Sequence, residues 1–117
     1  MQVDYQTGSL KKLAESEDKL FSKFRDMNIV KWVLSRIRHF EIADNLLEFF
    51  ENQPNCRIHP LKWSMKWNLA IDAVNKTCPI RCVFINKDWE NIAKDMYNKS
   101  KWQTVTAIMI LAIWDYH

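Results

Sequence analysis

Glycine and proline are scarce in this chain of 117 residues, which contains one glycine and three prolines. An all-β protein needs turn residues every several positions, so this scarcity argues against an all-β fold. A glycine-rich phosphate-binding loop is also excluded, because Gly8 is the sole glycine. The length predicts a single domain over residues 1–117, with residues 1–8 flexible.

Signals for export or membrane insertion are missing as well. The chain starts without the basic and apolar stretches of a signal peptide. Its longest apolar run, residues 105–114, is shorter than the roughly twenty residues that cross a bilayer. We therefore expect an intracellular protein without a membrane span, in the cytoplasm or the nucleus of a host cell. In that setting cysteines are thiols or metal ligands more often than disulfides.

Apolar residues recur at helical spacing along most of the chain. Such spacing is found in residues 10–27, 29–50, 60–74, 89–97 and 101–115. The second of these segments either stays one helix buried on several sides or breaks near His39. The last segment is apolar on nearly every side, which predicts a central helix. We expect an all-α, compact bundle of four to six helices, with one short extended segment around Val83 and Ile85.

Polar residues and prolines suggest where these helices begin and end. Side chains that can cap a helix N-terminus precede several apolar segments, at Ser9, Asn28, Asp88 and Ser100. Pro54 must follow the end of a helix, since proline disrupts a helix interior. Pro60 suits the first turn of the next one.

All three cysteines and one histidine lie between residues 56 and 82. Cys56 and His59 are separated by two residues, and Cys78 and Cys82 by three. Two such pairs match the ligand types of a structural zinc site, and Arg57 and Arg81 would offset its negative charge. A straight helix between the pairs, about 21 Å long, would hold them apart. The alternative is three thiols that pack in the core.

Two other uses of these cysteines have less support. A redox pair is disfavoured by the three-residue spacing and by the absence of a βαβ pattern. The cysteine cluster does not match a zinc deaminase, because His59 is followed by Pro60 and Leu61, which leaves no glutamate for a His-x-Glu element.

Positive charge is concentrated in the same part of the chain. The net charge of the protein is +3. Basic residues and Trp63 and Trp67 together suit phosphate contact and base stacking. The alternative is that both tryptophans face the core beside solvated lysines. The candidate nucleic-acid-binding residues are Arg36, Arg38, Arg57, Lys62, Lys66, Lys76 and Arg81.

The sequence carries no catalytic motif and no evident small-molecule site, so we do not expect an enzyme. We expect a binding module that acts through protein–protein interaction or as a homodimer, using the apolar faces of residues 29–50 and 101–115. The alternative is nucleic-acid binding through residues 54–82, with zinc as the one candidate cofactor. Abundant Lys, Asn and Ile with little Gly suit an AT-rich genome, which is compatible with a viral or phage accessory protein.

Overall fold

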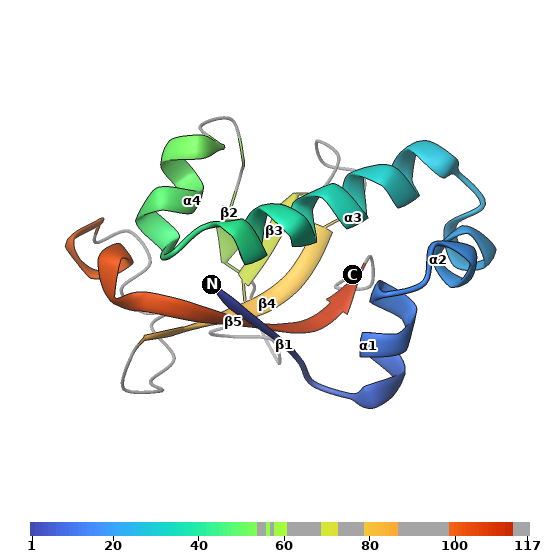
Figure 1. The fold of residues 1–117 in the computed structure, drawn as a ribbon, viewed down its shortest axis with the longest axis horizontal. Helices are drawn as coiled ribbons and strands as arrows, with labels where there is room; N and C mark the ends of the chain where they lie inside the picture. Colours follow the sequence, from blue (N-terminus) through green and yellow to red (C-terminus); the bar gives the residue numbers. More distant parts are fainter. Residues whose placement is uncertain (54–55, 57, 61–68, 73–78, 87–98, 114–117) are drawn as a thin grey trace.

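The computed structural model describes residues 1–53, 56, 58–60, 69–72, 79–86 and 99–113. Helices lie on one side of a sheet, with α3 crossing above the strands (Figure 1). The elements, in chain order, are β1 (Gln2–Tyr5), α1 (Gly8–Ala14), α2 (Glu17–Phe24), α3 (Met27–Ile42), α4 (Leu46–Asn52), β2 (Ile58–Pro60), β3 (Leu69–Asp72), β4 (Pro79–Asn86), the 3-10 helix η3 (Lys99–Thr104) and β5 (Val105–Ile113).

The fold is mixed α/β, so the expected all-α helical bundle is wrong. Five strands form one sheet in the order β1-β5-β4-β3-β2. β1 runs parallel to β5, whereas the other neighbouring pairs are antiparallel. Residues 1–8, which we expected to be flexible, contain the edge strand β1.

The largest error concerns residues 101–115, which we expected to be the central helix. Residues 105–113 instead form β5, which pairs with both β1 and β4 inside the sheet. An apolar run without alternation fits a strand buried on both faces as well as it fits a buried helix. The β-branched residues of β5 favour the strand, because Val, Thr and Ile pack well on a pleated sheet.

Two other strands differ from the expected elements. β3 occupies part of the helix expected over residues 60–74. The expected extended segment around Val83 and Ile85 belongs to β4, an eight-residue strand inside the sheet.

Polar caps divide the N-terminal half into four helices, of which α3, with 16 residues, is the longest. Thr7 and Ser16 cap α1 and α2 by accepting hydrogen bonds from the backbone N–H groups of Leu10 and Lys19. Asp26, and not Asn28, caps α3, and it accepts the N–H of Asn28 at 2.9 Å. The long apolar segment does break, but after Ile42, where Asn45 caps α4. Among the described residues no helix is long and apolar enough to cross a bilayer.

The core lies between the inner face of α3 and the sheet. α3 contributes Val30, Val33, Ile37 and Phe40, all buried and spaced at helical intervals. The sheet contributes the buried side chains Ile71, Ile80, Cys82, Ile108, Ile110 and Ile113.

A ladder of aromatic rings continues the core toward η3. The ring centroids of Phe40 and Phe49 are 4.8 Å apart, those of Phe49 and Phe50 are 5.1 Å apart, and those of Phe50 and Trp102 are 4.7 Å apart. The Arg36 guanidinium lies 5.9 Å from the Phe49 ring centroid. The rings therefore join α3, α4 and η3 into one packed unit.

Candidate functional site: the free edge of β1

β1 is an edge strand of the sheet, and one row of its peptide groups has no partner within the described residues. The Gln6 N–H donates to the Ile110 carbonyl at 3.0 Å, so the even-numbered residues of β1 direct their peptide groups toward β5. Peptide groups alternate between the two edges of a strand, so those of Val3 and Tyr5 point away from the sheet. No hydrogen bond to another described residue occupies the N–H and C=O groups of these two residues. They form a template for one more strand.

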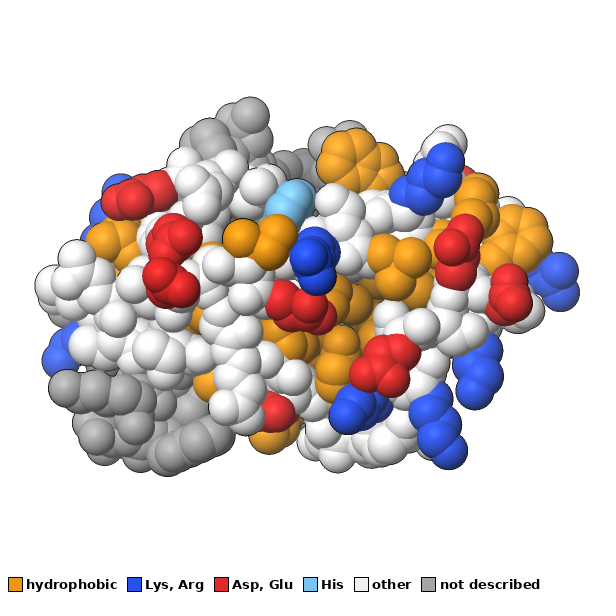
Figure 2. Space-filling view, in the orientation of Figure 1, with side chains coloured by type: hydrophobic (Ala, Val, Ile, Leu, Met, Phe, Trp, Pro, Cys, Tyr) orange, Lys and Arg blue, Asp and Glu red, His pale blue; other side chains and the backbone are white. Residues whose placement is uncertain are grey.

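A hollow opens beside this edge on the side of the helices, and we call it the helix-side hollow. Its volume is about 420 Å³, within the size range of ligand pockets. Apolar side chains are exposed on its floor, and charged side chains surround it (Figure 2). The lining residues are Val3, Tyr5, Lys11, Ala14, Glu15, Leu34, Ile37, Arg38 and Glu41.

A second hollow lies along the same strand, and we call it the outer hollow. It also has a volume of about 420 Å³. Val3, Tyr5 and Lys11 line both hollows, so the edge of β1 runs between them. The other lining residues are Asp4, Gln6, Thr7, Gly8 and Met109. Successive side chains of a strand point to opposite faces of the sheet. The side chains of an extended chain added to β1 would therefore enter the two hollows alternately.

Tyr5 lies at the end of the edge, where its phenol approaches two carboxylates. Its pKa is raised from 10.0 to about 12, chiefly by burial and then by the negative charges of Glu41 and Glu15. The Glu41 Oε2 atom also lies 3.8 Å from Arg38 Nη1, and both side chains are exposed. At neutral pH the Tyr5 hydroxyl is therefore protonated and can donate a hydrogen bond. Acidic and basic side chains both surround it at the helix-side hollow.

The raised pKa of Tyr5 predicts a loss of stability at high pH. The folded state releases the phenolic proton less readily than the unfolded state, so its stabilising contribution is complete below pH 10 and declines as the pH rises toward about 12. Compared with Tyr5→Phe, the wild-type protein should lose more free energy of unfolding over this interval. Denaturant titrations of both proteins at several pH values measure the difference. Parallel pH profiles would contradict the prediction.

The opposite edge of the sheet is less suited to strand addition. β2 contains three residues, the last of which is Pro60. Proline has no N–H to donate, and natural proteins place it on edge strands, where it limits pairing. The two edges thus differ, and the free peptide groups of β1 make it the better docking strand.

A smaller cavity of about 40 Å³ lies between α3 and α4 beside His39. Among the described residues His39 Nδ1 has no hydrogen-bond partner. Burial, and then the nearby charge of Arg36, lower the pKa of His39 from 6.5. A cavity of this size holds a water molecule and not an organic ligand.

The predicted zinc ligands are described only in part. Cys56 and Cys82 lie close enough that Cys56 adds to the upward shift of the Cys82 pKa, whose main cause is complete burial. His59 of β2 pairs with Ala70 of β3, and Cys82 of β4 pairs with Leu69 of β3. Leu69 and Ala70 are consecutive residues, so His59 and Cys82 are not in the same register across the sheet. Cys78 lies outside the described residues. Within the described part of the chain no three potential ligands cluster, and the zinc site stays a prediction.

The predicted nucleic-acid-binding residues have different environments. Arg36 is 9% exposed and donates to Gln53 Oε1 at 3.3 Å, so its charge belongs to the interior. Arg38 is exposed on α3, and Arg81 is half-buried in β4. The remaining candidates, Arg57, Lys62, Lys66 and Lys76, lie outside the described residues, as do Trp63 and Trp67. The described residues do not join these candidates into one basic surface.

We did not expect the β1 edge from the sequence, because residues 1–8 lack a long apolar pattern. The available signal was the short alternation of apolar Met1, Val3 and Tyr5 with polar Gln2 and Asp4.

The chain was also compared with known proteins. No protein-family model, curated protein or solved structure matches it.

Proposed function

We propose that this protein is a non-catalytic protein-interaction module that binds an extended segment of a partner as an additional strand on β1. The row of free peptide groups at Val3 and Tyr5, between two hollows, carries this proposal. In strand addition, main-chain hydrogen bonds give affinity and pockets for alternate side chains give specificity. The β1 edge offers both elements.

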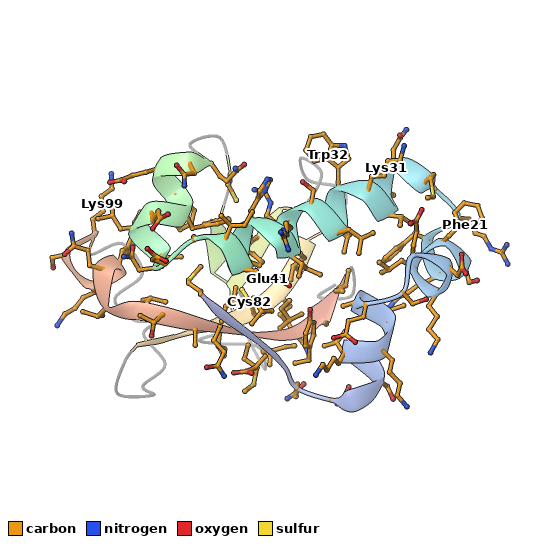
Figure 3. All side chains as sticks on the ribbon, in the orientation of Figure 1. Phe21, Lys31, Trp32, Glu41, Cys82 and Lys99 are labelled. Atoms are coloured by element: carbon orange, nitrogen blue, oxygen red, sulfur yellow. The ribbon has the colours of Figure 1, made fainter. Side chains whose placement is uncertain are left out.

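Exposed apolar side chains on the helices support a binding role. Phe21 on α2, Trp32 on α3 and Ile42 at the end of α3 are 41%, 51% and 59% exposed. Trp32 and Phe21 project from the helical layer into solvent (Figure 3). Tryptophan is enriched among the residues that dominate binding energy at interfaces. These side chains are exposed apolar area that is available for contact with a partner.

We propose that this activity takes place inside a cell. The composition suits a viral or phage accessory protein. Nucleic-acid binding is the weaker alternative, since Arg36 is buried.

Backbone methylation of a peptide tests strand addition without altering the protein. The probes are short synthetic peptides with alternating apolar and polar residues, labelled with a fluorescent dye. An N-methyl group on residues that face Val3 and Tyr5 removes donors and blocks close approach, so affinity should fall at least about tenfold. An N-methyl group on the residue between them points away from β1 and should change affinity little. Fluorescence anisotropy measures both.

Amide hydrogen exchange provides an independent control on the same complex. The N–H groups of Val3 and Tyr5 should exchange rapidly in the free protein and slowly with bound peptide. The Asp4 N–H, which faces β5, should be protected in both states. Equal effects of the two methylation patterns, or unchanged exchange at Val3 and Tyr5, would exclude strand addition at β1.

A further inference from the structure

Asp4 is the residue at the centre of the β1 edge, between the two free peptide groups. It pairs with Met109 of β5 and lines the outer hollow. Gln2 Nε2 donates to both carboxylate oxygens of Asp4, at 2.8 and 3.1 Å. These hydrogen bonds orient the carboxylate beside the position where the side chain of an added strand would lie.

The position of Asp4 disfavours a second copy of this chain as the added strand. Two β1 strands related by a two-fold axis use all the free peptide groups when Val3 of one copy faces Tyr5 of the other. That register places the two Asp4 side chains directly opposite each other, where like charges are destabilising. A register centred on Val3 would require the Met1 nitrogen, which already donates to the carbonyl oxygens of Phe40 and Ala43.

Two charged residues line the outer hollow, Asp4 on β1 itself and Lys11 on α1. Asp4 is the one in register with an added strand, so charge complementarity points to a basic residue in the partner. Opposite Asp4, an antiparallel strand has a non-hydrogen-bonded position, where side chains approach most closely. From this geometry we infer that the edge selects an extended partner segment with the pattern apolar–basic–apolar. The basic side chain lies against Asp4 at the outer hollow, and the inference rests on the strand addition proposed above.

The helix-side hollow determines the two apolar positions. Val3 and Tyr5 pack against the core on the side of the helices. Residues directly opposite each other in a strand pair share a face of the sheet, so the two flanking side chains of the partner enter this hollow. Its floor includes the buried side chains Ala14 and Ile37 together with Leu34. Val3, Tyr5 and Leu34 are only half-buried at this hollow, so apolar side chains of the partner would remove their remaining surface from water.

A charge-reversal experiment tests the central position. Two labelled peptides differ only in the middle of their triplet, leucine–lysine–valine or leucine–glutamate–valine. Wild-type protein should bind the lysine peptide up to about fivefold more tightly. Asp4→Lys should reverse this preference, and the uncharged control Asp4→Asn should remove it. Asp4 is partly exposed on an edge strand, and circular dichroism of each variant verifies that it folds.

The outcomes separate this inference from the proposed function. Equal affinity of the wild-type protein for both peptides, with the methylation pattern retained, would overturn the apolar–basic–apolar specificity but leave strand addition in place. Binding of neither peptide would overturn both. Light scattering provides one more arm, because the wild type should be monomeric. A wild-type dimer that the lysine peptide dissociates would identify a second copy as the occupant and overturn the inference.

Discussion

Phe49→Ala should lower the free energy of unfolding by about 3–5 kcal/mol, the range observed when a buried phenylalanine is truncated. Phe49 is completely buried and stands in the middle of the aromatic ladder, with Phe40 on one side and Phe50 on the other. Its removal leaves a cavity and also ends its contact with the Arg36 guanidinium. A domain of this size has about 5–15 kcal/mol of stability in total, so the loss would be severe.

Urea denaturation followed by circular dichroism measures this loss. Phe21→Ala is the matched control, because Phe21 is the same residue type but is 41% exposed on α2. Its effect should stay within about 0.5 kcal/mol. Similar effects of the two substitutions would show that the ladder does not stabilise the fold.

Gln53→Leu should cost about 1–3 kcal/mol, because the buried Arg36 guanidinium loses the Gln53 Oε1 acceptor. A charged group that loses a partner keeps the full cost of its removal from water. The double variant Arg36→Met/Gln53→Leu replaces both groups with apolar ones of similar length. We expect it to recover much of the stability lost in Gln53→Leu.

The same unfolding assay tests this pair as a double-mutant cycle. The coupling energy should fall within about 0.5–3 kcal/mol, as found for residues in direct contact. Gln53→Glu is the control, since it keeps an oxygen acceptor facing Arg36 and should retain stability. Additive effects of Arg36→Met and Gln53→Leu would show that the two side chains are not coupled.

The N-terminal half of the fold was partly predictable from local chemistry. Helical periodicity correctly placed helices within residues 8–52, and Pro54 correctly indicated that α4 ends before it. The caps were less certain, because Thr7 and Ser9, or Asp26 and Asn28, are chemically similar neighbours. Hydrogen bonds to the backbone N–H groups select Thr7 and Asp26.

The sheet was harder to predict, because its pairings join distant parts of the chain. A run such as that of β5 is compatible with a helix until β1 and β4 are known to flank it. Propensity also yields to tertiary context in β3, which follows no clear alternation. The β1 edge site depends on the same long-range pairing, since only the pairing with β5 determines which peptide groups stay free.

The pairing of β1 with β5 has a consequence for synthesis of the chain. The partners of β1 are residues 107–110, so β1 has no place in the sheet until these residues, about a hundred positions later, have been translated. At about 5–20 residues per second, this interval lasts roughly 5–20 seconds. During that time the helices can form locally, but Val3 and Tyr5 have neither their final neighbours nor the hollows around them. The β1 edge and the hollows beside it are thus completed only after β1 pairs with β5.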